Sequence, residues 1–395
     1  MNKNAWRVTF AAVFAGLAIA IIQNKVVPCI TVLQDTFSID AGTAGWLSSA
    51  FCVMGIVMAF PGALIVEKIG LKRTGLLSLL FGLIGTGIGM LSRSVPMLLV
   101  SRVIEGAGAG LIAIVVPSLI SLWFAPEKRG LPMSIWSTWQ IVAQSLCFLF
   151  GLTLTNALSW RGLWGAGGII TVLAALFFVL FVRVPDAGRE NAEAPARSES
   201  VSFSRALKSP AVWLVCLAMM FFTFSNFGFV TWVAPSWAEL FAMDPDVCNR
   251  YISIMYIFAL PVSVLFGFIL NRVDHKRFAV FSYLLYALIS ASAFILPSSS
   301  LILPFIILYP FAESAICAAM WTLVPEAAGD ARFVAVAMAL FGLLQNVGML
   351  LGPPFSGAVK DRFGIAAVAA AVLIPALIGT ALVALAKISK HSQES

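Results

Sequence analysis

Residues 61–73 read PGALIVEKIGLKR, a short charged stretch between two long apolar ones. The apolar stretches, about 42–66 and 75–92, are each long enough to cross the ~30 Å hydrocarbon core of a bilayer as an α-helix. Both are continuously apolar, whereas a membrane-spanning β-strand is shorter and alternates apolar with polar residues. The sequence around residues 61–73 therefore predicts two transmembrane helices joined by a basic turn.

The same pattern continues through the whole chain, of which 61% is hydrophobic and 11% charged. Polar residues are too few to cover a water-soluble domain of this length. The predicted spans are about 8–33, 42–66, 75–92, 96–123, 131–155, 163–182, 211–238, 250–270, 278–296, 300–323, 333–355 and 364–386. We expect an all-α integral membrane protein with twelve transmembrane helices.

The basic residues set the expected orientation. Of the 25 Lys and Arg residues, 18 fall in loops on the side of the N-terminus, five fall in loops on the other side, and Lys25 and Arg102 fall within spans. Cytoplasmic loops carry the excess of Lys and Arg. We therefore expect a multi-pass protein of the cytoplasmic (inner) membrane with both termini in the cytoplasm, and no nucleic-acid partner despite the net charge of +7.

The longest polar stretch, about Arg183 to Pro210, has the composition of a cytoplasmic linker. It predicts three parts: residues 1–183 with six spans, a linker over 184–210, and residues 211–395 with six more. The charged loop of the first half recurs at the same place in the second, as NRVDHKR over residues 271–277. Matching loops in matching places indicate an internal repeat.

These loops resemble the signature loop of the major facilitator superfamily, which runs glycine, apolar, acid, base, any residue, glycine and two bases. Ala63 stands where the first glycine is expected, and Glu67 replaces the usual Asp. In the second half Gly267 and Arg272 match, whereas Asn271 replaces the acid. Further resemblances are Arg102, Glu105, Gly106, Gly108 and Gly110 in the fourth span, residues 123–130 at its exit, and Asn346, Gly348, Gly352, Pro353, Gly357, Asp361 and Gly364 at the end of the eleventh.

The resemblance implies two six-helix bundles around a central cavity that opens alternately to each side, the fold of a secondary transporter. It also implies a cytoplasmic gating role for Glu67, Lys68, Arg73 and Arg272, against the plainer reading that these charges only set topology. The Gly-Pro pair of drug/proton antiporters is missing from residues 140–152. The bacterial cyanate/nitrate and carboxylate permease branches look nearest.

Four charged residues lie within predicted spans, where each costs several kcal/mol unless it has a partner or a function. Lys25 and Arg102 are candidate substrate contacts that attract an anion. Glu105, three residues after Arg102, projects to nearly the same face and is a candidate proton-coupling residue. The alternatives are that Lys25 reaches the head groups, or that it and Arg102 pair with Glu105 and brace the helices.

Glu313, near the middle of the tenth span, is the fourth charge, and Tyr309 lies one turn before it. Glu313 is a candidate for proton coupling or for binding a cationic group of the substrate, with a neutral, hydrogen-bonded Glu as the alternative. Other candidate substrate contacts, for each of which helix packing is equally open, are Asn24, Trp136, Gln140, Asn226, Tyr256, Tyr309, Gln345 and Asn346.

These residues favour a proton-coupled transporter, a symporter, of a small organic or inorganic anion of carboxylate type. A transporter or exporter of an organic cation, zwitterion or drug by proton antiport is the alternative, and a transport-inactive membrane sensor is a third. We expect no enzyme, since the sequence shows no nucleophile–base pair, metal cluster or cofactor loop. The expected partners are a small-molecule substrate, protons and the lipid bilayer, with no cofactor or metal and a monomeric chain.

Overall fold

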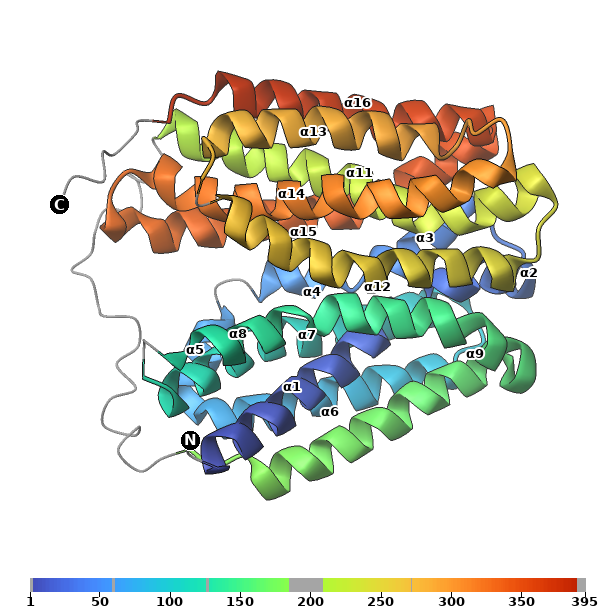
Figure 1. Ribbon diagram of the computed structural model, residues 1–395. Coiled ribbons are helices and arrows are strands. Elements are labelled where there is room, and N and C mark those ends of the chain that lie inside the picture. The colour runs from blue at the N-terminus through green and yellow to red at the C-terminus, as the bar shows by residue number, and fades with distance from the viewer. Residues whose placement is uncertain (1–2, 59–60, 126–127, 185–208, 271, 389–395) are drawn as a thin grey trace. The chain divides into compact units, whose positions relative to one another are not determined.

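The computed structural model describes residues 3–58, 61–125, 128–184, 209–270 and 272–388, and every regular element within these ranges is helical (Figure 1). The chain folds as two compact units. The first contains the described residues of Met1–Ser38 and Ala50–Ala196, and the second contains those of Ile39–Ser49 and Arg197–Ser395. Most of the predicted linker, 184–210, lies outside the described residues.

The helices of the first unit are α1 (Lys3–Asn24), the 3₁₀ turn η1 (Val27–Cys29), α2 (Ile30–Phe37), α4 (Cys52–Val57), α5 (Pro61–Ile69), α6 (Leu71–Met90), α7 (Val95–Trp123), α8 (Gly130–Ser137) and α9 (Trp139–Phe181). Within it, α1 packs against α7 and α9, and α6 packs against the same two helices. The predicted first span is interrupted after Asn24, just before Pro28, which cannot donate a helical hydrogen bond.

The helices of the second unit are α3 (Ala41–Ser49), α11 (Pro210–Phe241), α12 (Pro245–Leu270), α13 (His275–Ser292), the 3₁₀ turn η4 (Ser299–Leu301), α14 (Ile302–Ala328), α15 (Ala331–Phe363) and α16 (Ile365–Leu385). Here α11 packs against α15 and α16, α13 against α14 and α16, and α12 against α14.

Helix α3 belongs by sequence to the second predicted span, yet it packs against α15 of the second unit. Gly45 permits the contact, because a Cβ there would lie 2.5 Å from the backbone of Pro354. Two hydrogen bonds hold the pair: the Asp361 carboxylate accepts from the Gly42 N–H at 3.1 Å, and the Ser49 hydroxyl donates to the Leu350 carbonyl at 2.8 Å. The predicted boundary between the halves therefore does not follow the packing of residues 39–49.

Nine helical segments of the described residues are long and apolar enough to cross a membrane. One of them, Gly130–Phe181, has 52 residues, about 78 Å of helix at ~1.5 Å per residue. Ser159, with φ 64° and ψ 167°, breaks it into two helices, so it covers two predicted spans. With the interrupted α3–α4–α5 segment and α13, the described helices account for the twelve spans that the sequence predicts.

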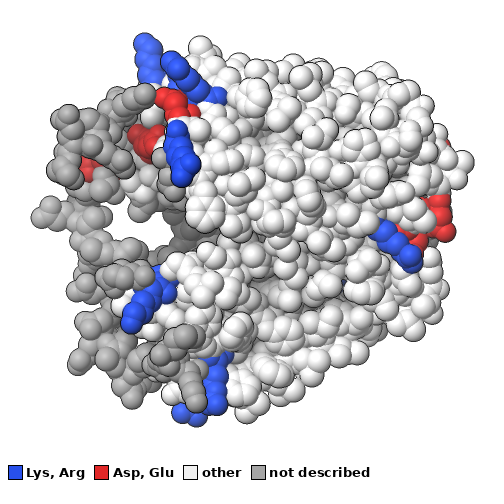
Figure 2. Space-filling model, viewed as in Figure 1, with Lys and Arg blue, Asp and Glu red and all other residues white. Residues whose placement is uncertain are grey.

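The outer surface along the helices is apolar. On the face drawn in Figure 2, the Lys, Arg, Asp and Glu residues gather near the helix ends, and the area between them carries almost none. Large apolar side chains such as Leu80, Phe150 and Phe268 are exposed on the surface of the protein. Such a surface suits lipid and not water.

The charged loop of each half ends at the start of a helix, α6 in the first half and α13 in the second. Gly70, with φ 82°, is the residue that precedes α6, and only glycine adopts this conformation without strain. Asp274 occupies the same place before α13, and its carboxylate accepts a hydrogen bond from the Arg277 N–H at 3.0 Å. The two matching loops thus start their helices differently, with a positive-φ glycine before α6 and a capping aspartate before α13.

Candidate functional site

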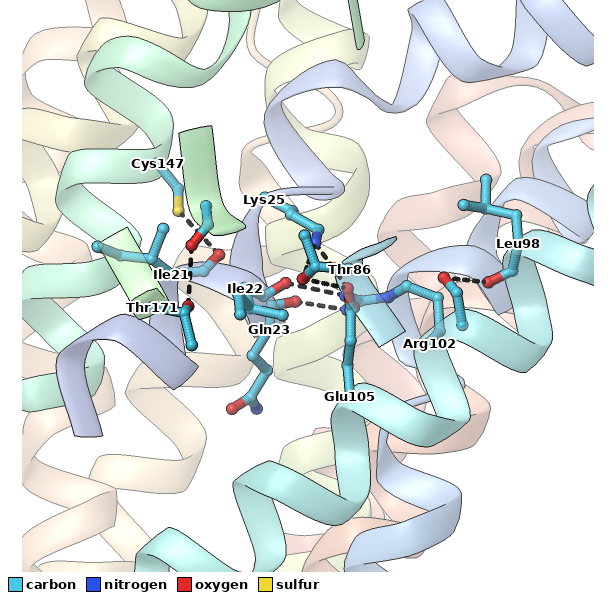
Figure 3. Close-up of polar contacts among 12 residues, drawn as sticks. Ile21, Ile22, Gln23, Lys25, Thr86, Leu98, Arg102, Glu105, Cys147 and Thr171 are labelled. Atoms are coloured by element: carbon cyan, nitrogen blue, oxygen red, sulfur yellow. Dashed lines mark hydrogen bonds and ion pairs between the residues drawn. The ribbon is translucent and has the colours of Figure 1, made fainter. Parts of the chain in front are cut away.

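Three of the four intramembrane charges form one cluster inside the first unit. The Lys25 Nζ lies 2.7 Å from one carboxylate oxygen of Glu105, and the Arg102 guanidinium donates to the other. Lys25 follows the last residue of α1, whereas Arg102 and Glu105 stand one turn apart on α7. Figure 3 shows both cations directed at the carboxylate. All three residues are at most 2% exposed.

Because α1 ends at Asn24, its last backbone carbonyls are available as hydrogen-bond acceptors for Arg102. The last carbonyls of an α-helix have no intrahelical partner. Arg102 donates to two of them, the Ile22 oxygen at 2.9 Å and the Gln23 oxygen at 2.5 Å. The arginine therefore joins α7 to the end of α1 as well as to Glu105.

Two residues that the sequence did not single out complete the cluster. The Thr86 hydroxyl of α6 donates to Glu105 at 3.0 Å, and Lys25 lies 3.3 Å from the same hydroxyl. The Lys25 ammonium also lies 4.6 Å from the ring centre of Trp164, a cation–π contact. Thr86 stands between Gly85 and Gly87, and a hydroxyl within an apolar span was the only signal available for it.

Close helix packing fixes the position of the Glu105 carboxylate. A Cβ on Gly85 of α6 would lie 2.6 Å from the Glu105 Cγ, and one on Gly106 would lie 2.0 Å from the Phe51 carbonyl oxygen. Neighbouring backbone therefore approaches α7 on both sides of Glu105, which small residues allow in membrane helices. The sequence left open whether Lys25 reaches the head groups or pairs with Glu105, and the structure shows the pair.

The cluster holds two cations and one carboxylate, so its formal charge is +1 when all three groups are ionised. A buried charge is stable only when other groups compensate it. The carbonyl oxygens on Arg102 and the hydroxyl and ring on Lys25 supply dipoles and not full negative charge. The cluster is thus electrostatically suited to accept one further negative charge.

A chain of side-chain amides lies next to the cluster in sequence and connects α1 with α9. The Asn24 side chain donates to the Gln140 side-chain oxygen, Oε1, at 3.1 Å, and the Gln140 amide donates to the Gln23 side-chain oxygen, Oε1, at 3.0 Å. The structure thus brings together the predicted residues Asn24 and Gln140. Trp136 instead stacks on Trp139, with ring centres 4.4 Å apart, within the apolar core of the first unit.

A second polar cluster lies inside the second unit. Asn226 of α11 donates both to the Glu313 carboxylate at 2.9 Å and to the Tyr309 hydroxyl at 2.8 Å, the latter two residues lying on α14. Tyr309 stacks on Phe229 with ring centres 4.5 Å apart, and its ring lies 5.9 Å from that of Tyr286. No ion pair joins Glu313 to a Lys, Arg or His among the described residues.

Of the other predicted contacts, Tyr256 of α12 is 3% exposed and lies close enough to Glu313 and Tyr286 to interact with them electrostatically. Gln345 and Asn346 make bonds elsewhere. The Asn346 side chain donates to the Gly342 carbonyl of its own helix at 2.8 Å, and Gln345 is bonded through its backbone carbonyl to the Thr223 hydroxyl at 3.0 Å. Tyr286, which the sequence did not single out, belongs to the aromatic group around Tyr309.

The residues predicted to gate lie at helix ends. Glu67, Lys68, Arg73 and Arg272 are all exposed. None of the ion pairs found in the described part of the chain includes them. In the same described part, no group of three His, Cys, Asp or Glu residues is placed to hold a metal ion.

Comparison with known proteins identifies the family. The family model described as Major Facilitator Superfamily matches residues 8–335 and 251–394. The chain belongs to the major facilitator superfamily. It is therefore a multi-pass membrane protein from a family of transporters, and it is not an enzyme.

Among relatives within the superfamily, the uncharacterized transporter YycB of Bacillus subtilis (strain 168) is 23% identical over 385 residues, 95% of this chain and 92% of that one. The uncharacterized MFS-type transporter YcnB of the same organism is 27% identical over 154 residues, 38% of this chain. That alignment covers 32% of YcnB, so the chain spans only about a third of this relative's length.

A solved structure supports the fold over nearly the whole chain. It is the crystal structure of a bacterial homologue of the human lysosomal transporter Spinster, in its inward-facing and unoccupied conformation. The TM-score is 0.75, the sequence identity is 19%, and the alignment covers 98% of this chain and 95% of that one. At this identity the likeness concerns the fold alone, and it confirms the all-helical architecture predicted from the sequence.

Proposed function

We propose that this member of the major facilitator superfamily is a secondary active transporter of a small organic or inorganic anion, of carboxylate type. It moves this anion across the cytoplasmic membrane by alternating access, coupled to protons. The observation that carries the proposal is the buried cluster of Lys25, Arg102 and Glu105, with its surplus of one positive charge. We propose a resemblance in substrate class to the cyanate/nitrate and carboxylate permease branches.

The charge balance of the cluster suggests how an anion and a proton exchange. Glu105 in its ionised form occupies both cations. When Glu105 takes up a proton, Lys25 and Arg102 lose their charged partner, and a substrate carboxylate replaces it. Arg102 offers a planar donor pair that matches a carboxylate. Proton binding and anion binding therefore favour each other at this cluster, which is the requirement for symport.

Glu313 is the second proton site that we propose. Its carboxylate is held by the Asn226 amide, with no cation paired to it among the described residues. A buried carboxylate without a cation favours its neutral form. Glu313 thus carries a proton without binding the anion itself.

The remaining parts of the proposal follow the family pattern. Two six-helix bundles, residues 1–183 and 211–395, operate with both termini in the cytoplasm. Glu67, Lys68, Arg73 and Arg272 act in gating on that side. Their exposure at helix ends leaves them accessible for charge pairing in another conformational state.

A ligand-stabilisation screen tests the substrate class. Thermal unfolding in detergent is measured for the wild type with a panel of small carboxylates, inorganic anions and organic cations. We expect anions to stabilise the wild type and to lose this effect in Lys25→Met, while Lys276→Met, which removes an ammonium in the first turn of α13, responds as the wild type does. Each shift is taken against the same variant without ligand, so a lower intrinsic stability of Lys25→Met does not imitate the result. Stabilisation by cations alone would refute the proposal.

The aromatic group around Glu313 supports a second candidate, transport or proton-coupled export of an organic cation, zwitterion or drug. Tyr309 shares the Asn226 amide donor with Glu313, and Phe229 and Tyr286 lie against Tyr309. Aromatic faces of this kind bind cations. In that case Glu313→Gln abolishes binding of the cation in the same screen. If Glu313 serves only the proton, Glu313→Gln binds the anion as the wild type does and fails only in proton-driven uptake.

A further inference from the structure

A groove of about 790 Å³ runs along the first unit between the first half of α1 and the end of α9. These two helix segments pack side by side, with α1 and the last part of α9 adjacent in Figure 1. The groove is lined by Phe10 and Phe14 of α1 and by Leu173, Phe177 and Phe181 of α9, with Arg7 at one end. Its volume falls within the range of roughly 300–1,000 Å³ that pockets for small ligands occupy.

The aromatic side chains form a continuous apolar surface in the groove. Phe14 meets Phe177 edge to face, with ring centres 5.7 Å apart, and Phe177 lies 5.6 Å from Phe181. Phe10 is 57% exposed and Phe177 is 48% exposed, so both rings remain accessible to a ligand. An alkyl chain is the kind of ligand that such a surface contacts along its length.

The chemistry changes at the end of the groove where Arg7 lies. Arg7 is exposed, and among the described residues it makes no hydrogen bond or ion pair. Lys72 lies at the same end of α9, since its ammonium donates to the Val179 carbonyl oxygen at 3.0 Å. No acidic side chain lines the groove. The charged end therefore favours an anionic group.

The neighbouring tryptophan indicates the depth of this end in the membrane. The Trp6 ring lies 5.6 Å from that of Phe10. Tryptophan is enriched at the level of the lipid head groups. From Arg7 to Phe14 the helix rises about 10 Å, so the groove passes from head-group depth into the hydrocarbon.

We propose that this groove binds an anionic phospholipid of the surrounding bilayer. Its phosphate pairs with Arg7, and one acyl chain lies on Phe14 and Phe177. The order of the chemistry along the groove, a cation and a tryptophan at one end and phenylalanines beyond, matches the order of a phospholipid. Basic pockets between transmembrane helices bind anionic head groups for the same electrostatic reason. This site is separate from the proposed transport site and does not depend on the substrate.

Native mass spectrometry of the full-length protein, released from detergent containing either phosphatidylglycerol or phosphatidylcholine, tests the proposal. We expect the wild type to retain phosphatidylglycerol at least threefold more than phosphatidylcholine. Arg7→Gln should lower this ratio to near one, and Arg7→Lys should keep most of it. Arg93→Gln is the matched control, because Arg93 is an exposed arginine beyond the opposite end of α6 from Lys72.

Equal retention of phosphatidylglycerol by the wild type and Arg7→Gln would overturn the proposal, as would equal loss in Arg93→Gln. A lipid-free dimer of the wild type that Arg7→Gln dissociates would assign the groove to a second copy of the chain and overturn it as well. Because Arg7 is exposed on α1, its replacement leaves the packing of the first unit intact, and matching thermal unfolding of both arginine variants verifies this.

Discussion

Replacement of Glu105 by Gln tests whether this carboxylate compensates two buried cations. Glu105→Gln keeps the shape of the side chain and raises the charge of the cluster from +1 to +2. At the observed Lys25–Glu105 separation of 2.7 Å, two unit charges attract by about 6 kcal/mol at an effective dielectric constant of ~20. Desolvation offsets part of this attraction, and loss of one partner from a buried pair costs about 3–5 kcal/mol.

A double variant separates this charge effect from loss of packing. Lys25→Met combined with Glu105→Gln returns the cluster to a charge of +1, carried by Arg102 alone. We expect it to be more stable than Glu105→Gln by about 1–3 kcal/mol, the coupling energy typical of contacting groups. Lys25→Met alone leaves Arg102 paired with Glu105 and should lose less stability than Glu105→Gln.

The assay is thermal unfolding of the four proteins in the same detergent, at one pH and without added anion. The expected order of midpoints places the wild type first, the double variant next and Glu105→Gln last. If Glu105→Gln unfolds with the wild type, or if the double variant gains nothing over Glu105→Gln, the electrostatic role assigned to Glu105 is wrong.

Two further predictions concern packing and pH. Gly85→Ala places a methyl group 2.6 Å from the Glu105 Cγ and should destabilise the folded protein by about 1–3 kcal/mol. A methyl group in Gly87→Ala, on the same helix, meets nothing within 4 Å, so this variant should be neutral or slightly stabilising. Equal unfolding midpoints for the two variants would refute the close packing. Burial lowers the pKa of His275, but its hydrogen bonds to Glu326 at 2.5 Å and to the Leu270 carbonyl at 2.9 Å outweigh this and raise the pKa above its ordinary value. The pair stabilises the fold by at most about 1 kcal/mol, because it is so exposed. This stabilisation is full below the ordinary pKa of His275 and is lost as the pH rises through the raised pKa. The unfolding midpoint of the wild type should therefore exceed that of His275→Gln at pH 5.5 and match it at pH 8.5, and a difference that grows with pH would contradict this.

The sequence predicts the helical architecture well because a membrane-spanning helix is recognised from the length and apolar composition of its own segment. Residues 130–181 are an example, since their apolar length requires two spans and Ser159 supplies the break. The placement of residues 39–49 against α15 was not predictable, because the small residues that permit it, such as Gly45, carry no signal of their partner.

The candidate site was predicted in part for the same reason. Lys25 and Glu105 are identifiable from the sequence because placing a charge in hydrocarbon costs free energy. This cost marks a charged residue in a span even when its neighbours in the fold are unknown. Thr86 and Trp164 were missed, since neither is costly in a membrane and only the fold brings them to Lys25. Residue type alone makes Trp136 a candidate contact, whereas in the structure its ring stacks on Trp139 in the apolar core.

Proton-driven uptake measures the coupling of the buried cluster to transport. The protein is reconstituted in liposomes, and uptake of the labelled carboxylate that stabilises it most in the screen is followed with and without an inward proton gradient. We expect the gradient to speed uptake several-fold, a protonophore to remove the gain, and Glu105→Gln to take up the anion at a rate that ignores the gradient. Wild-type uptake that is equally fast with and without the gradient, or that responds only to organic cations, would contradict a proton-linked anion site at Lys25, Arg102 and Glu105.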